Sequence, residues 1–596
     1  MDKIAEKKEK KWPHFVLYVA LFLILLYSRF VNIRWGLPYP FHPDERNIAN
    51  AIQNLTCHID FKFSSWGFLK ECLNPKFFAY GQFSIYLGYA LALVSRLYTH
   101  LVGPIQFDEA VVAIRLIAAV ASMLTVWAAL KIVKVITDSF LVYLTAYLLL
   151  IFSPAAIQFA HFGTTESLLM LFYTLIIYVC IRFAREEVSM GTFAGACGFL
   201  IGMAAGAKIS SLIFAILPFS LFLFPRKKKA EKIDFKTHIK ILGERLLSLI
   251  IFGTTIVAVT FATSFYSFLA SKEALSALDY ESAVALGKLE VFYTRTFAHT
   301  IPVIFHFMNV FPFALGWLMT VLFALGFFIL PWKREQIVMR MAFLFYFLPT
   351  AFTFTKWTRF MAPIFPLMVL FGVFTLFWLY DAGVNFVRDN PRLQFGIKNA
   401  SLMVDSLFFS VAIAALMIPG LAYLTIYQTP DVRYQASEWI FKNVKPDARI
   451  VEETANVIDI PIPPPGMEHV PPTNYGYVSF NFYDLDADPS LPIALQKYID
   501  TADYIFIPSR RIFANHTCLG KSLDVCQQLR RKYPILNNYY DGLFSGQLGF
   551  KQVAEFSSYP RIELFGKTIL ELPDEVAEET WTVFDHPVIR IYKRTP

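Results

Sequence analysis

An acidic pair, Asp44 and Glu45, follows directly on the first long apolar run of the chain, within the stretch WGLPYPFHPDERN at residues 35–47. His42 and Arg46 flank the pair, so four groups that can carry charge fall within one short segment. A carboxylate in this setting can accept a proton from an attacking hydroxyl group. A lone acidic pair could equally be a loop that needs charge to stay hydrated. Whether the pair is catalytic or only hydrated therefore depends on which other charged residues lie at the same end of the apolar runs.

Three further segments place charged side chains at the ends of apolar runs, on what we predict to be that same face. AHFGTTES carries His161 and Glu166, AGAKISS carries Lys208, and TKWTRFMAPIFP carries Lys356 and Arg359. Such a set suits the transfer of a group from a phosphate, because a carboxylate accepts the proton while Lys and Arg neutralise the departing phosphate. A phospholipid headgroup is the alternative partner of each cation, and for Lys356 it is an equal alternative.

Arg115 lies inside an apolar run, near its predicted outer end. A charge in this position is costly and needs a partner. We therefore count Arg115 among the candidate substrate-binding residues, with a simple ion pair to Asp108 or Glu109 as the alternative.

Several classes of cofactor are not indicated. The sequence has no Walker-type glycine loop, no Gly-rich dinucleotide fingerprint and no His/Cys spacing typical of zinc. ATP and nucleotide-sugars are not expected outside the cell, so a lipid-carried donor is the natural source of an activated group. No cofactor is certain, and a divalent metal such as Mg²⁺ or Mn²⁺ stays open.

The composition predicts a polytopic membrane protein. Of the 596 residues, 56% are hydrophobic and only 17% are charged, which is too few to cover a soluble protein of this size. The net charge of +8 does not indicate nucleic acid, because the basic residues cluster between apolar runs. About eleven runs reach the length of a membrane-spanning helix. They lie near 14–33, 112–133, 139–157, 167–184, 190–207, 209–225, 246–265, 311–330, 339–354, 361–380 and 401–425.

Basic clusters predict the orientation of these runs. KKEKK at the N-terminus and RKKKAEK at residues 226–232 should both be cytoplasmic, so an odd number of spans separates them. Counting the apolar run at 81–98 as a span would make the number even. We therefore predict an interfacial helix there, with an ordinary span as the alternative.

The composition changes after the last run. Residues 426–596 are more polar and Pro-rich, with short β-like runs, and predict an extracytoplasmic α/β domain behind a membrane domain of residues 1–425. Cys57 and Cys72 lie in the first outer loop, and Cys518 and Cys526 lie in this domain, so two short disulfides are expected outside. Residues 509–511 (SRR) are interpreted as a polar strand end.

Four motifs carry a resemblance to a known family: FHPDER, NPKFFAYGQFSIYLG, HFGTTES and TRFMAPIFP, with AGAKISS as a weaker fifth. In this order they resemble the C-type superfamily of membrane glycosyltransferases that use polyprenyl-phosphate-linked sugars. The nearest branch holds the protein O-mannosyltransferases (glycosyltransferase family 39) and the lipid A aminoarabinose transferases. ADYIFIPSRR and YYDGLFSGQLGF resemble the outer domain of bacterial relatives.

The resemblance implies roles for individual residues. Asp44 would be the catalytic base, and Glu45 would orient the acceptor or an ion. Glu166 lies at a position where relatives often have Asp, so the resemblance does not define the role of this longer carboxylate. The donor phosphate would be bound by Lys208 and Arg359. The further residues assigned to substrate binding are Lys356, Arg46, His161 and Arg115. A phosphate leaving group needs neutralisation more than an acid, which implies transfer with inversion and a single base.

The resemblance also sets the expected partners and location. These are a polyprenyl-phosphate sugar donor, the lipid bilayer, and a protein, glycolipid or cell-wall polymer as acceptor, with no nucleic acid. We expect a multi-pass protein of the plasma membrane with a cytoplasmic N-terminus and an outer C-terminal domain, acting in protein glycosylation or on the cell envelope. Two other classes remain: a transporter or flippase of the lipid-linked sugar, which should carry ionisable groups at mid-membrane, and a non-catalytic scaffold.

Overall fold

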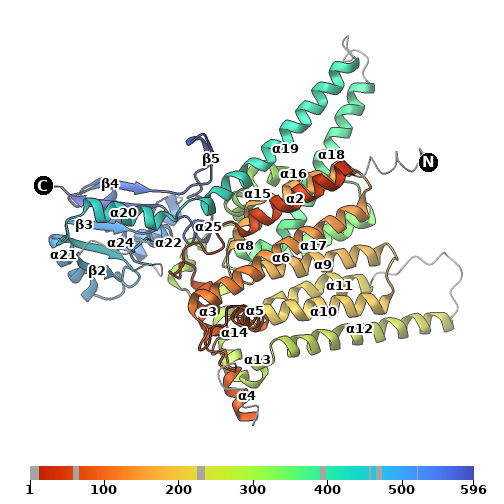
Figure 1. Cartoon of the computed structure of the whole chain (residues 1–596), viewed down its shortest axis with the longest axis horizontal. Helices are drawn as coiled ribbons and strands as arrows, with labels where there is room; N and C mark the ends of the chain where they lie inside the picture. The colour runs from red at the N-terminus through yellow and green to blue at the C-terminus, as the bar shows by residue number, and fades with distance from the viewer. Residues whose placement is uncertain are drawn as a thin grey trace.

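The computed structural model describes residues 12–57, 66–223, 235–389, 398–454, 458–464, 473–519, 521 and 523–595. Its larger part is a bundle of helices, and its smaller part is a sheet domain at one end of that bundle (Figure 1). The helices of the bundle are α2 (Trp12–Phe30), α6 (Phe107–Ile136), α7 (Phe140–Ile151), α8 (Pro154–His161), α9 (Glu166–Ala184), α10 (Met190–Ala207), η1 (Ile209–Ala215), α11 (Ile216–Leu223), α12 (Phe235–Thr263), α15 (Phe311–Leu315), α16 (Trp317–Ile329), α17 (Arg334–Ala351), η4 (Thr358–Ile364), α18 (Phe365–Asp389) and α19 (Lys398–Gln428).

Each of the apolar runs found in the sequence is helical, but not all are long straight spans. Among the described residues, six helices are long and apolar enough to cross a membrane, or up to eight if each of two bent pairs is one span. The pair α7–α8 bends by 47° and the helices on either side of Gly316 by 116°. Two apolar segments, Phe15–Phe30 and Ile209–Leu223, are shorter, and α17 carries three charged residues. The predicted number of eleven spans is therefore not confirmed, while a multi-pass helical fold is.

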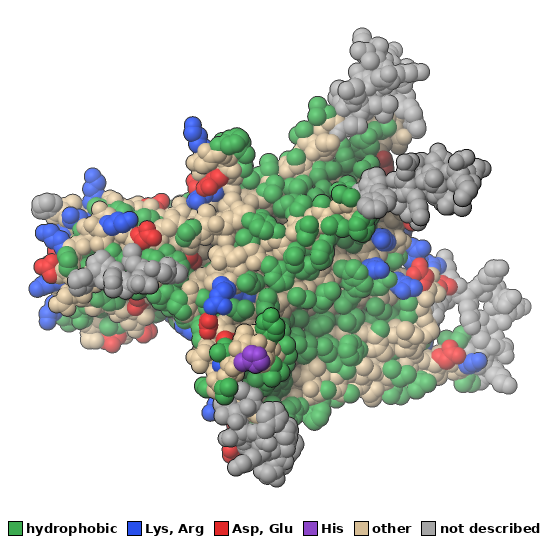
Figure 2. Space-filling view, viewed as in Figure 1, with side chains coloured by type: hydrophobic (Ala, Val, Ile, Leu, Met, Phe, Trp, Pro, Cys, Tyr) green, Lys and Arg blue, Asp and Glu red, His purple; other side chains and the backbone are tan. Residues whose placement is uncertain are grey.

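Hydrophobic side chains cover the sides of the bundle, and charged ones gather towards its two ends (Figure 2). α2 begins at the end of the bundle that lies away from the sheet domain (Figure 1). This banding is what a bilayer requires, because apolar side chains face lipid while charges face water or headgroups.

Short helices collect at the end of the bundle that carries the sheet domain. They are α3 (Pro43–Gln53), α4 (Trp66–Cys72), α5 (Phe83–Thr99), α13 (Tyr266–Leu269), α14 (Ser271–Ala285), η2 (Phe292–Phe297) and the π-helix η3 (His306–Val310). α5, the helix predicted to be interfacial, is not among the candidate spans. Gly81, two residues before it, donates its N–H to Ala207 O at the end of α10 (3.0 Å). α5 therefore lies at this end of the bundle, although its depth relative to a bilayer stays a prediction.

The C-terminal part is an α/β domain, as predicted. Its sheet has the order β2-β1-β3-β7-β4; β1 runs parallel to β2 and β3, and β7 runs antiparallel to β3 and β4. The strands are β1 (Arg449–Glu453), β2 (Gly476–Phe480), β3 (Tyr504–Ile507), β4 (Phe550–Phe556) and β7 (Ile589–Arg594), with a separate hairpin of β5 (Arg561–Leu564) and β6 (Lys567–Glu571). The helices are α20 (Val432–Asn443), α21 (Ser490–Thr501), α22 (Arg511–His516), α23 (Leu523–Lys532), α24 (Pro534–Ser545) and α25 (Glu579–Thr582). The predicted boundary after residue 425 falls inside α19.

Both expected disulfides are present, Cys57–Cys72 and Cys518–Cys526. Cys180 and Cys197 are buried and free, as apolar core residues. One disulfide lies among the short helices at the end of the bundle, and the other lies in the sheet domain at that same end.

Candidate active site

The acidic motif forms the first turn of α3. His42 is the N-cap, and its Nδ1 accepts the N–H of Glu45 (3.4 Å), while Pro43 stands at the first helical position, which suits its fixed φ. Burial lowers the pKa of His42 although Asp44 and Glu45 act in the opposite direction, so the imidazole is neutral and able to accept this bond. The carboxylates of the first turn also gain from the helix dipole. The fold thus presents Asp44 at a capped helix start.

Asp44 forms an ion pair with Arg359 of η4, 315 residues further along the chain. The Arg359 guanidinium lies over the Trp357 ring, 4.6 Å from its centroid. The side chains of Asp44 and Arg359 keep 22% and 21% of their surface exposed, so the pair is reachable by a ligand. Burial alone would raise the pKa of Asp44, but the charges of Arg359 and, more weakly, Lys208 outweigh it and hold the pKa below its ordinary value. Asp44 is therefore ionised at neutral pH.

A second ion pair joins the end of α10 to the start of α9. Lys208 is the C-cap residue of α10, and its Nζ lies 3.4 Å from Oε1 of Glu166, the first residue of α9. The same Nζ is 5.1 Å from the Tyr80 ring and 5.3 Å from the Phe360 ring, within reach of cation–π attraction. Since Phe360 directly follows Arg359, the two predicted phosphate-binding cations share one aromatic side chain.

A cavity of about 320 Å³ opens beside these cations. Lys208 and Arg359 stand among its lining residues, together with the apolar side chains of Leu169, Ile213 and Phe214. Pro349 and Tyr346 of α17 complete much of the apolar wall. A phosphate joined to a hydrocarbon chain matches this arrangement of charge next to apolar surface.

The structure separates Glu45 from Asp44. Arg115 donates from Nε to Glu45 Oε1 and from Nη2 to Oε2, both at 2.7 Å, and Gly163 N–H donates to Oε1 at 2.8 Å. Arg115 Nη1 also donates to Trp35 O (2.7 Å). Both side chains are almost fully buried. Through these contacts Glu45 and Arg115 hold the loop after α2 against α6 and α8, and the predicted roles of Glu45 in catalysis and Arg115 in substrate binding stay predictions.

The alternative partners proposed for Arg115 are wrong. Asp108 pairs with Arg34 (3.0 Å), and Glu109 pairs with Arg96 of α5 (3.0 Å). The physical reason is that Arg115 lies farther inside the bundle, where the buried Glu45 carboxylate gives it a charged partner without a path through solvent.

The other predicted binding residues lie apart from the ion pairs. Lys356 is buried and donates to Phe354 O (2.9 Å), and burial lowers its pKa. His161 is fully buried; its ring nitrogens lie 2.8 Å from Ile157 O and 2.9 Å from Val31 O. Arg46 is half-buried in the first turn of α3. The geometry favours structural roles for Lys356 and His161.

Sequence reasoning missed two residues that face the ion pairs. The hydroxyl of Tyr80 hydrogen-bonds Asp44 and helps to lower its pKa. Glu281 of α14 keeps an exposed surface in front of the site; partial burial raises its pKa, while Arg359 lowers it. Tyr80 lies within the motif NPKFFAYGQFSIYLG, so a signal for it existed. Glu281 has no such signal, because nothing in SKEALSALDYESAVA distinguishes it from a solvated helix.

A segment of the C-terminal part, residues 574–586, packs into the bundle next to the site. Trp581, Val583 and Phe584 belong to the hydrophobic core of the bundle. The Phe584 ring lies 4.4 Å from the His42 ring, and Glu578 Oε2 accepts the N–H of Thr358 (2.9 Å). These two contacts fall one or two residues from Asp44 and Arg359, so one segment supports both members of that ion pair.

Polar contacts hold this segment in place. Asp585 Oδ2 accepts bonds from Tyr423 (2.9 Å) and Tyr427 (2.8 Å) of α19, and its Oδ1 lies 2.6 Å from His586 Nδ1. On the domain side, Arg511 pairs with Glu579 at 3.1 Å. The SRR stretch, predicted to be a polar strand end, is therefore part of the joint between the two parts of the molecule.

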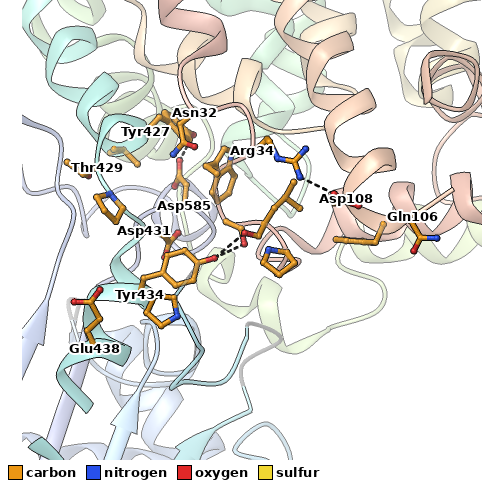
Figure 3. Close-up of a pocket in the computed structure, with 18 residues that line it drawn as sticks. Asn32, Arg34, Gln106, Asp108, Tyr427, Thr429, Asp431, Tyr434, Glu438 and Asp585 are labelled. Carbon is orange, nitrogen blue, oxygen red and sulfur yellow. Dashed lines mark hydrogen bonds and ion pairs between the residues drawn. The ribbon is translucent and has the colours of Figure 1, made fainter. Parts of the chain in front are cut away.

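A second cavity, of about 720 Å³, lies between the first outer loop, the start of α6 and the junction of α19 with α20 (Figure 3). Four carboxylates line it, Asp108, Asp431, Glu438 and Asp585, against the single cation Arg34. Asp108, Asp431 and Asp585 are paired with Arg34, Arg433 and His586. Since Asp108 already neutralises Arg34, the described residues of this lining offer a phosphate no uncompensated cation, and the smaller cavity beside Lys208 and Arg359 is the better candidate donor site. Among the described residues, no group of three or more His, Cys, Asp or Glu side chains is arranged to hold a metal ion.

Comparison with known families confirms the resemblance over part of the chain. Residues 91–257 match the model of a family described as dolichyl-phosphate-mannose-protein mannosyltransferase. This segment runs from α5 through α12 and includes Glu166 and Lys208. No curated protein sequence matches the chain significantly.

Solved structures with a similar arrangement include ArnT from Cupriavidus metallidurans in the apo state, with a TM-score of 0.44, 14% identity, and coverage of 85% of this chain and 94% of that chain. The same protein bound to undecaprenyl phosphate gives a TM-score of 0.46 and 12% identity over 83% of this chain and 92% of that one. The arabinofuranosyltransferase AftD from Mycobacteria gives a TM-score of 0.37 and 10% identity over 97% of this chain and 41% of that one.

Proposed function

We propose that this protein is a membrane glycosyltransferase that moves a sugar, of the hexosyl or mannosyl type, from a polyprenyl-phosphate carrier to an acceptor hydroxyl. The observation that carries the proposal is the cavity beside Lys208 and Arg359, which joins two cations and an apolar wall to the Asp44 carboxylate. The matched family model adds support, since dolichyl phosphate mannose is a polyprenyl-phosphate sugar. No Gly-rich nucleotide motif competes with this assignment.

Asp44 is the base in this mechanism. The acceptor oxygen attacks the anomeric carbon, the bond from that carbon to the phosphate oxygen breaks, and the hydroxyl proton passes to Asp44. Lys208 and Arg359 neutralise the phosphate that leaves. The attack is in line and inverts the anomeric centre. Glu166 holds Lys208 in position through the 3.4 Å contact.

The Asp44–Arg359 ion pair implies that the donor binds before Asp44 acts as a base. Without donor, Arg359 neutralises Asp44 and lowers its basicity. A donor phosphate that engages Arg359 competes for its charge, so the pKa of Asp44 rises towards the range useful for a base. Donor binding thus activates Asp44 before the acceptor is deprotonated.

The direct test is to incubate the purified protein, reconstituted in lipid, with a panel of polyprenyl-phosphate sugars and to measure the released polyprenyl phosphate. Candidate acceptors are a Ser/Thr peptide, a glycolipid and a cell-wall glycan. Release that Asp44→Asn abolishes supports the proposal. If no donor releases lipid phosphate but a donor crosses the bilayer, the protein is a flippase instead.

The proposed setting follows the same logic. Two disulfides and the sheet domain lie at the end of the bundle that carries the site, which supports an outer, oxidising location for the reaction. We propose the plasma membrane, with the N-terminus in the cytoplasm and the sheet domain outside. Labelling of single cysteines placed at each end of the bundle in intact cells tests this orientation.

A further inference from the structure

A small cavity lies between α23 of the sheet domain and the outer segment 290–299. Its volume is about 160 Å³, the space of about five water molecules at ~30 Å³ each. Arg295, Lys521 and Lys532 line it, and its one carboxylate is Glu290. Glu290 already pairs with Lys532 at 2.7 Å, so among the described lining residues no further carboxylate offsets the charges of Arg295 and Lys521.

Arg295 is held in place, but two of its nitrogen atoms lack acceptors in the described part of the chain. Its guanidinium stacks over the Tyr533 ring, 4.5 Å from the centroid. Its Nε and Nη1 atoms are buried and have no hydrogen-bond partner among the described residues. A buried guanidinium donor without an acceptor costs free energy, and charged groups cost the most. The geometry therefore calls for an anionic acceptor.

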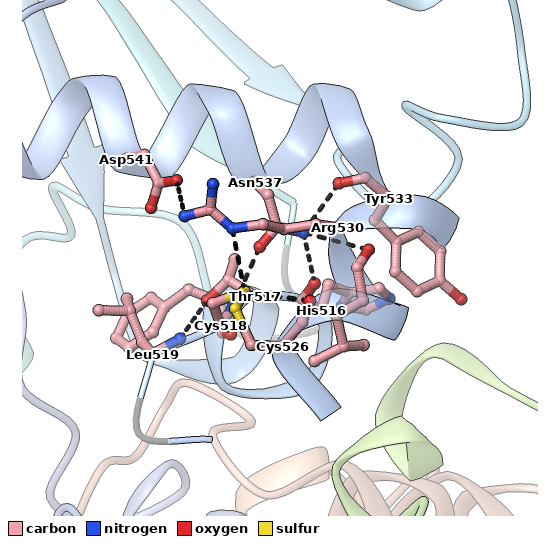
Figure 4. Close-up of a disulfide and its surroundings, with 11 residues drawn as sticks. His516, Thr517, Cys518, Leu519, Cys526, Arg530, Tyr533, Asn537 and Asp541 are labelled. Carbon is pink, nitrogen blue, oxygen red and sulfur yellow. Dashed lines mark hydrogen bonds and ion pairs between the residues drawn. A yellow bond between two sulfur atoms is a disulfide. The ribbon is translucent and has the colours of Figure 1, made fainter. Parts of the chain in front are cut away.

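Lys521, which also lines the cavity, supports an anionic ligand as well. Its Nζ donates to Thr296 Oγ1 at 3.2 Å, a neutral partner for a charged donor. Burial, and secondly Arg510, lower the pKa of Lys521 to about 8, which reflects poor compensation of its charge. The disulfide Cys518–Cys526 ties the strand of chain that leads to Lys521 onto α23 (Figure 4). The cross-link closes a short loop of the chain that contains Lys521, which limits how far this cation can move from α23.

We propose that this cavity binds a phosphate-type anion, which fastens the outer segment 290–299 to α23. Arg295 offers charged donors that have no acceptor among the described residues, and Lys521 supplies a second charge. Phe354 lines the same cavity and lies five residues before Arg359. The anion therefore stabilises the chain that leads into the candidate active site, and this role is independent of the transfer reaction.

The test measures stabilisation of the full-length protein in phosphatidylcholine nanodiscs. Sodium phosphate is titrated against sodium chloride at constant ionic strength, and the unfolding temperature is recorded. Lys208→Gln is the background for every variant, because it removes one phosphate-binding cation of the candidate active site from the readout. A parallel series replaces phosphate by a rising fraction of phosphatidylglycerol.

We expect saturable stabilisation by phosphate, with a dissociation constant weakened about tenfold or more by Arg295→Gln or Lys521→Gln. Lys497→Gln, an exposed lysine of α21, is the matched control and should bind as the parent does. If phosphatidylglycerol stabilises with the same variant pattern and phosphate does not, the anion is a lipid headgroup and the site stands.

Two results would overturn the proposal. One is that neither anion stabilises the parent protein, and the other is that Arg295→Gln, Lys521→Gln and Lys497→Gln all respond alike. If Arg295→Gln fails to fold because the stack on Tyr533 is lost, Lys521→Gln decides, since that change leaves the stack intact. Arg295→Lys keeps the charge but loses the guanidinium donors, and should weaken binding less than Arg295→Gln.

Discussion

Exchanging Glu45 for Gln should damage the stability of the protein more than its chemistry. The Glu45 and Arg115 side chains are 3% and 1% exposed, and their two contacts are both 2.7 Å, so neither solvent nor salt screens the pair. Gln keeps one acceptor for Gly163 N–H but turns an NH₂ group towards Arg115, which leaves a buried cation without its counter-charge. Breaking a buried pair in this way costs about 3–5 kcal/mol.

This cost translates into a measurable change of unfolding temperature. At about 2 °C per kcal/mol, the lower end for large domains, the expected loss is about 6–10 °C. The assay is thermal unfolding in detergent at a fixed heating rate, since unfolding of a membrane protein is a rate process. Asp44→Asn is the comparison: that pair is about one-fifth exposed and therefore partly screened, so its loss should lower the unfolding temperature less than Glu45→Gln does.

A double variant separates the contribution of the pair from that of Arg115 alone. Glu45→Gln combined with Arg115→Met removes both charges and should recover part of the loss. Recovery stays incomplete because Ile33 O and Trp35 O lose the donors that Arg115 gives them. The reasoning is refuted if Glu45→Gln unfolds at the parent temperature and yet abolishes transfer, because Glu45 would then act on the substrate.

Asp44→Asn should lower transfer about 100-fold or more while polyprenyl phosphate still binds at least as well, because Arg359 loses its competing partner; rate and lipid-binding assays on one preparation check both. Lys208→Gln should weaken binding of that lipid about tenfold, and unchanged affinity would place the phosphate elsewhere. Glu578→Ala should lower turnover because Thr358 N–H loses its 2.9 Å acceptor, whereas Glu578→Gln should keep most activity; equal losses would contradict this role. Burial lowers the pKa of His586, but Asp585 and Asp574 raise it to about 10, above the unfolded value of about 6.5. Stabilisation by His586 is therefore complete below about pH 6.5 and is lost as the pH rises towards 10; unfolding temperatures across this interval should fall more steeply in the parent than in His586→Asn.

Local patterns predicted much of this molecule. Apolar runs of about 20 residues became helices, because a hydrocarbon environment leaves the backbone few other ways to satisfy its hydrogen bonds. Both disulfides join cysteines that lie close in sequence, so spacing alone indicated them. The ends of alternate membrane runs lie at one face, so the sequence predicted that Asp44, Lys208 and Arg359 share a face, and the structure brings them together.

Pairings between distant residues could not be predicted in the same way. Glu45 lies next to Asp44, and nothing in the sequence says that one meets Arg115 inside the bundle while the other meets Arg359 at its rim. The support from residues 574–586 was missed for the same reason: Glu578 contacts Thr358 across 220 residues, and its type fits a solvated loop equally well. Tertiary packing decides such contacts, and periodicity carries no information about it.

The position of the supporting segment along the chain has a consequence for biosynthesis. Phe584 and Glu578 reach residues that precede them by hundreds of positions, including His42 near the beginning of the polypeptide. The helices of the bundle and nearly the whole sheet domain are therefore synthesised before the last contacts that support Asp44 and Arg359 can form. A nascent chain that ends before residue 578 would lack these contacts, so the candidate site is completed only at the end of synthesis.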